Sequence, residues 1–319
     1  MPAIRAPRRR HATDRPSVVV LGDLVVDVVL GPDKALERGT DVTGRVMLRQ
    51  GGSASNTARW LGRLGTRASL VCAIGFDAPG RALVAAVTAD KVLVRAVRVA
   101  GARTGRIGVL VEPGGERSFV TERGAALRLR PGDLKPEWFT GADALHLPAY
   151  SLLDQPLGEA GMAAAGLAHA AGALVTVDLS SSAPLLAGGR RAAMALVREA
   201  APDLLFATKD EARALLGAKD EDHLLDLAPI AVVKRGRKGA TIHLRDGKAA
   251  LRFEVATTPV KAPDTTGAGD AFDAGFLAGW LDARQAGLAP AAALQRGAVT
   301  GNRTALRHIS SAPVELVFG

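Results

Sequence analysis

The amino-acid sequence predicts an α/β protein in which helices cover both faces of a mostly parallel sheet and a smaller β-sheet lies beside it. Short apolar runs alternate with Ala-rich segments whose apolar residues recur at helical spacing. The runs lack polar alternation, which is typical of strands buried on both faces. Strand, helix and strand in succession indicate a parallel sheet. The 319 residues suffice for one large domain or two smaller ones.

The expected elements follow one another along most of the chain. Buried strands are expected at Ser17–Leu21, Ala68–Ile74, Ala173–Val177, Leu204–Ala207 and Ile230–Val233. The helices that cover them are expected at Ala54–Leu64, Arg81–Ala89, Leu157–Ala171 and Arg190–Ala200.

Two stretches with alternating apolar and polar residues, Gly44–Gln50 and Gly105–Thr121, do not fit the buried-strand pattern. They predict half-exposed strands within about residues 36–50 and 103–123, and the second stretch contains the turn Pro113-Gly114-Gly115. A small sheet attached to the main body would act as a lid. Because the apolar face of so small a sheet has little core to cover it, we expect a homodimer joined through the lids.

The composition limits the class of protein. Apolar residues make up 48% and charged residues 23% of the chain, which is typical of a folded globular protein. Cys72 is the only cysteine, so an intramolecular disulfide is excluded, and the histidines lack zinc-site spacing. The sequence has no strongly apolar run of membrane-spanning length and no secretory signal, so we expect a cytoplasmic location and no membrane partner.

The basic charge is concentrated at the start of the chain. Residues 1–16 carry five arginines and one aspartate, and thus supply +4 of the formal net charge of +9. Such a segment is expected to be a disordered, solvated tail, and the remainder is only mildly basic. We therefore expect no nucleic-acid partner.

The strongest local signal is the glycine-rich segment Asp264–Asp270, which runs into an apolar segment with helical spacing. Glycines allow the backbone to aim free N–H groups from a helix start, where the positive end of the helix dipole favours an anion such as phosphate. A carboxylate would repel phosphate, so Asp270 is better explained as a base that faces an attacking hydroxyl. An N-cap carboxylate is the structural alternative.

Two further segments carry polar residues toward the same region. The Gly-Gly turn that contains Gly52 brings the backbone close to a ligand, and Asn56 at the following helix start offers both a donor and an acceptor to a polyol. Asp27 follows the first strand, where a carboxylate can accept hydrogen bonds from two neighbouring hydroxyls. Considered alone, the Gly-Gly segment could be a turn followed by a polar helix cap, and Asp27 could be a solvated loop residue. Ligands of parallel sheets bind beyond the carboxyl ends of the strands, so we expect the segments to meet there.

Together these segments resemble the ribokinase-like carbohydrate kinase family, also called PfkB. Both family signatures are present in order, at Gly51–Gly65 and Asp264–Gly279, and the resemblance extends from about Ser17 to the end of the chain. Smaller landmarks of the family lie between them, at Gly75–Gly80, Val177–Leu179 and Val233–Ala240.

The resemblance implies a three-layer αβα sandwich with a β lid, over residues 17–319, and a kinase that uses ATP and Mg²⁺ to phosphorylate a hydroxyl of a sugar or nucleoside. It implies that Asp270 is the catalytic base and that the anion hole is formed by Gly267, Ala268, Gly269 and Asp270. The substrate hydroxyls would be bound by Asp27, Gly52 and Asn56. The residues next to the nucleotide would be Lys234, Arg235, Gly236, Gly239, Thr265 and Thr266.

The sequence departs from the family pattern at several positions. Thr208 stands where the family usually has Asn, while Glu211, implied to order Mg²⁺ through water, is kept. Ser53 replaces a Lys of many ribokinases and Val25 a frequent Asn, which argues against ribose itself. The run 310–312, Ser-Ser-Ala, replaces a common Gly-Ala, so a site for a monovalent cation such as K⁺ stays open.

Three functions remain open at this stage. The first is a kinase that acts on a sugar or sugar derivative. The second is a nucleoside kinase of the pseudouridine or adenosine type, which would need an apolar wall for the base from Phe76, Phe119 or Tyr150. The third is a non-catalytic sugar- or nucleotide-binding regulator, which would explain Thr208 but not the retention of Asp270.

Overall fold

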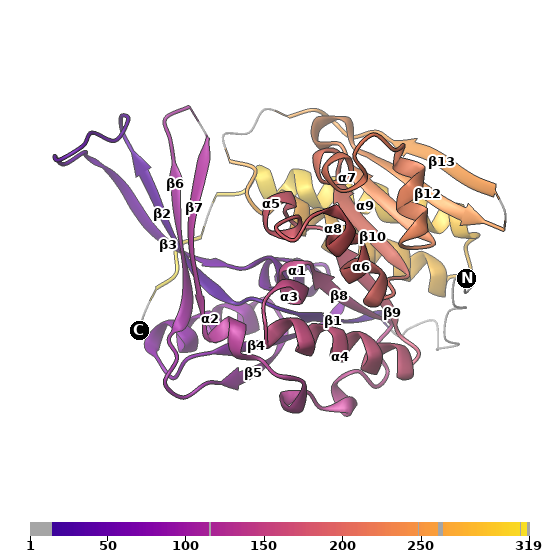
Figure 1. Ribbon diagram of the computed structural model, residues 1–319, viewed down its shortest axis with the longest axis horizontal. Coiled ribbons are helices and arrows are strands. Elements are labelled where there is room, and N and C mark those ends of the chain that lie inside the picture. The colour runs from indigo at the N-terminus through magenta and orange to yellow at the C-terminus, as the bar shows by residue number, and fades with distance from the viewer. Residues whose placement is uncertain (1–14, 115, 248, 261–263, 313, 318–319) are drawn as a thin grey trace.

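The computed structural model describes residues 15–317 except 115, 248, 261–263 and 313. Most of the predicted tail, residues 1–16, lies outside the described residues. The described chain forms one large and one small β-sheet (Figure 1). The spatial order of the large sheet is β13 (Ala249–Val255), β12 (Ala240–Asp246), β11 (Ile230–Lys234), β10 (Leu204–Thr208), β9 (Leu174–Asp178), β8 (Ala144–Pro148), β1 (Ser17–Leu21), β4 (Arg67–Ile74) and β5 (Leu93–Arg98).

This large sheet is mostly parallel, as predicted. Only β12 pairs antiparallel, with β11 on one side and β13 on the other, among the described strands. Successive residues of the apolar strands point to opposite faces, so that Val18 and Val20 of β1 enter one core and Val19 and Leu21 the other. Both faces of the strand are therefore apolar, which explains why these runs show no alternation.

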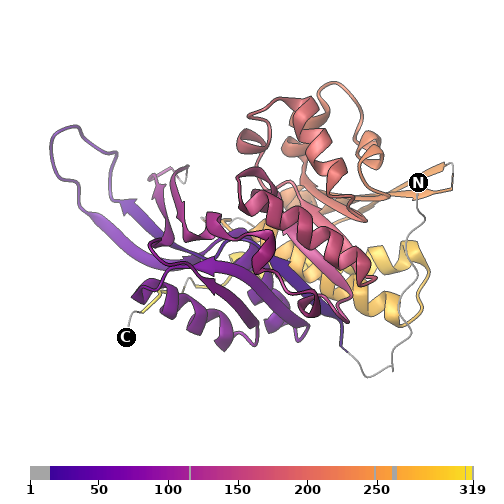
Figure 2. The same cartoon turned by 60° about the horizontal axis from the view of Figure 1, so that its bottom comes forward.

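Helices cover both faces of the large sheet, which confirms the predicted αβα sandwich (Figure 2). The helices on one face are α1 (Ser53–Arg63), α2 (Ala78–Ala89), α8 (Ala268–Gln285) and α9 (Pro290–Ile309). Those on the other face are α3 (Tyr150–Leu153), α4 (Leu157–Ala170), α5 (Ser182–Leu185), α6 (Arg190–Glu199) and α7 (Lys209–Leu216). Short 3₁₀ helices lie at η1 (Ala125–Arg128), η2 (Pro131–Asp133), η3 (Pro136–Trp138), η4 (Glu221–Asp226) and η5 (Gly236–Lys238). No described helix is long and apolar enough to cross a lipid bilayer.

The small sheet projects from the body beside the large one (Figure 1), and we call it the lid. Its strands, in spatial order, are β3 (Gly44–Gly51), β2 (Val25–Pro32), β6 (Thr104–Val111) and β7 (Arg117–Gly124). The predicted lid strands, within about residues 36–50 and 103–123, did not include β2, and Asp27 was expected only to follow the first strand. The chain instead re-enters extended structure three residues after β1, because Val25-Val26 and Val28-Val29 flank Asp27 and continue the apolar run.

The base of the lid is fixed by a buried ion pair. Arg123, near the end of β7, donates from Nε and Nη2 to the two carboxylate oxygens of Asp23 at 2.8 and 2.9 Å. Asp23 lies in the short connection from β1 to β2, and Arg123 also donates to Asp154 at 2.7 Å. Bidentate pairs of this kind combine strength with fixed geometry. The pair therefore ties the lid to the body where the two sheets meet.

Four strands of the large sheet were not predicted. Two of them, β12 and β13, form the antiparallel end of the sheet, and β5 forms the other edge, where four residues are partly exposed and two are exposed. Edge strands carry polar residues because one side meets solvent. The central strand β8 was missed because His146 interrupts its apolar run, although this ring is fully buried and contacts Thr176 Oγ1 at 3.0 Å.

Candidate active site

Helix α8 begins at a backbone turn that suits an anion. Gly267 is its N-cap and has a left-handed φ of 76°, which glycine adopts without strain. The Thr266 N–H donates to Asp264 Oδ1 at 2.8 Å, and the Ala268 N–H to the Thr265 carbonyl at 3.1 Å. The N–H groups of Gly269 and Asp270 lie in the first turn, where an α-helix offers no acceptor. Of the predicted anion hole, the part from Gly269 to Asp270 is thus the most available to a ligand.

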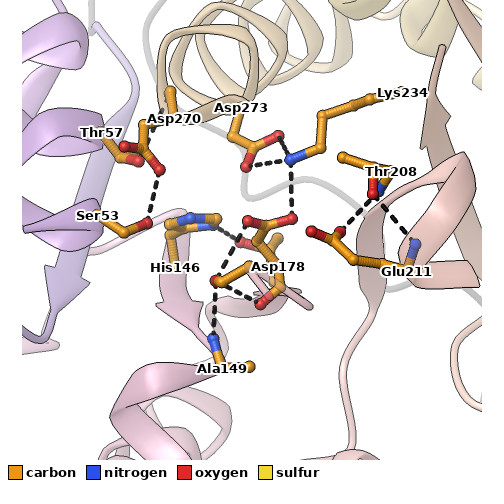
Figure 3. A network of polar contacts seen from close by, with 12 residues as sticks. Ser53, Thr57, His146, Ala149, Asp178, Thr208, Glu211, Lys234, Asp270 and Asp273 are labelled. Atoms are coloured by element: carbon orange, nitrogen blue, oxygen red, sulfur yellow. Dashed lines mark hydrogen bonds and ion pairs between the residues drawn. The ribbon is translucent and has the colours of Figure 1, made fainter. Parts of the chain in front are cut away.

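Asp270 lies in the first turn of α8 but does not cap the helix, since Gly267 holds that position without a side-chain hydrogen bond. Its carboxylate accepts hydrogen bonds from Ser53 Oγ at 2.6 Å and from Asn56 Nδ2 at 2.9 Å (Figure 3 shows the Ser53 contact). Burial raises the pKa of Asp270 to about 6, and these two donors hold it from rising further. The carboxylate is therefore mostly ionised at neutral pH, as a general base must be.

The first glycine-rich segment approaches the lid closely. A β-carbon on Gly51 would lie 2.0 Å from Asp27 Oδ1, and one on Gly52, whose φ is 98°, would lie 2.4 Å from the Asp23 carbonyl oxygen. Burial, together with the charge of Asp270, raises the pKa of Asp27 to about 7, while Arg49 opposes the rise. Asp27 and Asn56 line one cavity of about 360 Å³ with Gly267. The structure thus brings together three segments that are far apart in sequence.

Lys234 belongs to a buried charge cluster beneath the start of α8. Its ammonium contacts Asp178 Oδ1 at 2.8 Å and both oxygens of Asp273 at 3.1 and 3.2 Å (Figure 3). Burial alone would lower the pKa of Lys234, but the two carboxylates outweigh it and raise the pKa above its usual range. A β-carbon on Gly269 would lie 3.5 Å from Nζ. Lys234 thus lies beneath the anion hole with its charge already paired by two carboxylates, and its predicted place next to the nucleotide stays a prediction.

The other residues expected at the nucleotide lie in two separate turns. Arg235 donates to Glu221 and to Thr241 Oγ1, so its guanidinium is occupied by the protein itself. Gly236 and Gly239 form the exposed and the buried end of the tight turn that joins β11 to β12. Thr265 is exposed and Thr266 half-buried next to the start of α8. These glycines and threonines present backbone and hydroxyl groups, whereas Arg235 does not reach outward.

Thr208 and Glu211 form a reciprocal cap at the start of α7. The Thr208 N–H donates to Glu211 Oε2 at 2.8 Å, and the Glu211 N–H donates to Thr208 Oγ1 at 3.2 Å (Figure 3). Burial and the nearby Asp178 charge raise the pKa of Glu211. Threonine therefore fixes the Glu211 side chain through the cap, and the substitution of the usual Asn leaves this carboxylate in a defined orientation beside the charge cluster.

His308 was not predicted as a site residue, although it contacts the anion hole. Its Nε2 lies 2.6 Å from the Thr266 carbonyl oxygen, and its Nδ1 lies 3.2 Å from Trp60 Nε1. Because indole can only donate, Nδ1 must accept, so Nε2 carries the proton that is donated to Thr266. The imidazole thereby holds the turn before α8. The two partners lie far from His308 in sequence, and a single histidine near the end of a helix carries no motif.

A helix start with free N–H groups, an ionised carboxylate held beside it and a lid over both are the features of an enzyme that transfers a phosphoryl group to a hydroxyl. The chain belongs to the PfkB family of carbohydrate kinases, since the model of the pfkB family carbohydrate kinase matches residues 15–315. This confirms the family resemblance of the sequence.

Similar proteins agree with this assignment. The fructokinase of Klebsiella pneumoniae is 31% identical over 270 residues, which cover 82% of this chain and 83% of that protein. An ATP-dependent ribose-1-phosphate kinase of Halopiger xanaduensis is also 31% identical and covers 94% of this chain and 97% of its own. The crystal structure of adenosine kinase from Sinorhizobium meliloti superposes with a TM-score of 0.79 at 25% identity, over 96% of this chain and 97% of that one.

Proposed function

We propose that the protein is an ATP-dependent kinase that transfers the γ-phosphoryl group to a hydroxyl of a sugar or sugar derivative. The observation that carries this proposal is the position of the Asp270 carboxylate, in the first turn of α8 and hydrogen-bonded to Asn56. A base beside an anion site suits a reaction in which a hydroxyl attacks a phosphate.

In the proposed reaction Asp27 and Asn56 hold hydroxyls of the sugar and thereby aim one of them at the γ-phosphorus. The Asp270 carboxylate takes the proton of this hydroxyl as its oxygen forms the new bond to phosphorus. The bond from the γ-phosphorus to the bridging oxygen breaks, and ADP leaves with that electron pair. The N–H groups of the anion hole, above all those of Gly269 and Asp270, face the charge on the transferred group. Most of the rate gain would come from this positioning and charge stabilisation.

Mg²⁺ fits this site as a companion of ATP. No three acidic, histidine or cysteine side chains among the described residues converge to hold a metal ion by themselves. Glu211 is oriented by its cap through Oε2, which leaves the other oxygen available to a water of the metal. When bound, Mg²⁺ supplies positive charge to the phosphates. The solved structure of an Escherichia coli ribokinase II contains ATP and Mg²⁺. A role for K⁺ remains an expectation.

A nucleoside kinase is the second candidate, because an adenosine kinase and the aminoimidazole riboside kinase of Salmonella enterica share this fold at 25% identity. Of the three aromatic residues considered for a base, Phe76 and Phe119 are 61% and 54% exposed. Tyr150 is half-buried, and its burial, together with the charge of Asp270, raises the pKa of its hydroxyl. Tyr150 is therefore the better candidate for a wall.

The test is a phosphorylation assay with ATP and Mg²⁺ against sugars, sugar derivatives and nucleosides. We expect ADP release that depends on a sugar and is lost in Asp270→Asn. Turnover of nucleosides alone would favour the second candidate. Turnover of no compound, by a protein that binds ATP, would overturn the proposal and favour a regulator.

A further inference from the structure

Two arginines of the lid reach the candidate site from opposite edges of the sheet. Arg49 of β3 pairs with Asp27 of β2, so both side chains project from the same face. Arg49 also lines the cavity that Asp27 and Asn56 share. Arg117 lies at the start of β7, the other edge strand of the lid. The two guanidinium groups therefore enter the space beneath the lid from its two sides.

Both arginines converge on one carboxylate. Nη1 of Arg49 lies 3.3 Å from Asp264 Oδ2, and Nη2 of Arg117 lies 2.9 Å from Asp264 Oδ1. The two arginine side chains are 20% and 16% exposed, whereas that of Asp264 is 43% exposed. Two permanent positive charges thus meet a single carboxylate that partly faces solvent.

Donors of both arginines are left without acceptors. The Nε atoms of Arg49 and Arg117 are buried and have no hydrogen-bond partner among the described residues. The remaining Nη2 of Arg49 contacts the sulfur of Met47 at 3.8 Å, which is a weak acceptor. Buried donors without acceptors destabilise a fold. Arg49 lines the cavity, and Arg117 contacts Asp264, which also lines it, so a ligand in this cavity is a candidate source of acceptors for the two guanidinium groups.

Two other arginines of the lid have protein carboxylates of their own. Arg106 of β6 contacts its cross-strand neighbour Glu122 at 2.6 Å. Arg123 holds two oxygens of Asp23 and one of Asp154. Among the described arginines, buried Nε atoms without a partner also occur in Arg95 and Arg245, but only Arg49 and Arg117 meet at Asp264 under the lid.

We propose that the sugar substrate carries an oxyanionic group, a phosphate or a carboxylate, and that Arg49 and Arg117 bind this group beneath the lid. The proposal rests on the proposed function and names the class of sugar that it acts on. A guanidinium fork matches the geometry of both oxyanions and binds them through two parallel hydrogen bonds. In this arrangement the Asp264 carboxylate orients both guanidinium groups, and the ligand supplies the remaining hydrogen-bond acceptors.

The test compares three sets of substrates under saturating ATP and Mg²⁺: neutral sugars, their monophosphates and the corresponding sugar acids. We expect kcat/KM to be at least tenfold higher for one of the anionic sets than for the neutral parents. A preference for monophosphates identifies phosphate as the group, and a preference for sugar acids identifies carboxylate.

Variants connect the preference to the two residues. Arg49→Met and Arg117→Met should each lower kcat/KM for the preferred anionic sugar by roughly 10- to 100-fold, mainly through KM, because each removes charge-assisted hydrogen bonds. For a neutral sugar the loss should be smaller, so that the ratio of kcat/KM for the anionic to the neutral sugar falls at least fivefold in each variant. Arg49→Lys, which keeps the charge but loses the fork, should lie between Arg49→Met and the parent. Arg106→Met is the matched control and should leave the preference unchanged.

Two results would overturn the inference. The first is a preference for neutral sugars. The second is an equal loss of activity toward neutral and anionic sugars in both methionine variants, which would mean that the arginines only clamp Asp264. If no sugar is phosphorylated, the proposed function fails, and calorimetric titration with the sugar monophosphates and acids in the absence of ATP decides the inference. Binding that Arg49→Met abolishes supports it, and absence of binding refutes it.

Discussion

The side-chain amide of Asn56 donates a hydrogen bond of 2.9 Å to Asp270 and so joins the two glycine-rich segments, 214 residues apart. Ser53 donates to the other oxygen of the same carboxylate at 2.6 Å. Both donors favour the ionised carboxylate, whereas its burial favours the protonated form. Asn56, which is expected to bind the sugar, therefore also orients the base and, together with Ser53, affects the pH range in which the base accepts a proton.

Asp270→Asn should lower kcat by about 10²- to 10⁴-fold and leave KM nearly unchanged, because the amide cannot take the proton of the attacking hydroxyl. Steady-state kinetics measures both constants. Asp282→Asn, the same substitution at an exposed position of α8, is the control and should retain full activity. The assignment of Asp270 would be wrong if the variant kept more than about a tenth of the parent kcat.

The reaction should speed up as pH rises. The pKa of Asp270 lies at about 6 and that of Asp27 at about 7, both above the usual value for a carboxyl group. Each carboxyl group therefore becomes ionised at a higher pH than an ordinary aspartate. We expect kcat/KM to increase between pH 5 and 8, with apparent pKa values that belong to the coupled pair. Asp27→Asn should remove the upper part of this rise. A profile that is flat over the range would contradict the prediction.

The same shifts predict a change in stability with the opposite sign. Because the folded protein holds protons on Asp27 and Asp270 that the unfolded chain has already released, their contribution to the free energy of unfolding falls as pH rises from about 4 to 7. Asp270→Asn removes an unfavourable buried charge at neutral pH. We expect its melting temperature to equal or exceed that of the parent, and a clear decrease would show that the carboxylate is structurally required.

Asp27→Ala and Asn56→Ala should raise KM and lower kcat, since each leaves the attacking hydroxyl poorly placed. Asn56→Ala should also move the pH profile of kcat to higher pH, because a hydrogen bond that lowers the pKa of Asp270 is lost. Asp33→Ala, at an exposed position just beyond β2, serves as the control. Parent-like kinetics of both variants would exclude these residues from substrate binding.

Lys234→Met should lower the free energy of unfolding by about 3 to 5 kcal/mol, because Asp178 and Asp273 would remain buried without their counter-ion. Denaturant titration measures this. Lys238→Met, at an exposed position of the adjacent turn, should change stability little. If both variants unfold alike, the charge cluster does not stabilise the fold.

The lid is expected to join two copies of the chain. Leu30, Val46 and Val120 project from one face of the lid and are 38%, 66% and 78% exposed. Burial of such a face in a partner lid would stabilise a homodimer. Sedimentation at micromolar concentration should find a dimer that Val46→Lys dissociates, and a monomer with and without substrate would refute the expectation.

Much of the fold could be predicted because its signals are local. Strands such as Ser17–Leu21 are apolar on both faces, and glycines mark the starts of α1 and α8. Asp270 and Asn56 could be predicted as site residues for the same reason, because each lies next to a glycine-rich segment in the sequence. Asp27 was expected just after the first strand, with a solvated loop as the alternative, whereas it lies within β2 between Val26 and Val28.

The remaining site residues depend on contacts between distant parts of the chain. Arg49 and Arg117 can be recognised as site residues only from their shared contact with Asp264. His308 can be recognised only from its contact with Thr266, which lies 42 residues away. A buried lysine such as Lys234 looks like part of a basic loop until its two carboxylate partners are known. No periodicity or motif reports such pairs, since the fold alone brings them together.

The ion pair between Arg123 and Asp23 fixes one end of the lid to the body, so the lid can rotate about that end as a pivot. Eight extended residues in β2 give an arm of about 26 Å. A rotation of about 10° about the pivot would move the far end by roughly 4 to 5 Å, but Asp27, near the pivot, by only about 1 Å. Arg117 lies toward the far end, opposite the last residue of β6. Opening would thus move Arg117 away from the cavity several times farther than Asp27, while Asp270, which belongs to α8 of the body, would stay in place.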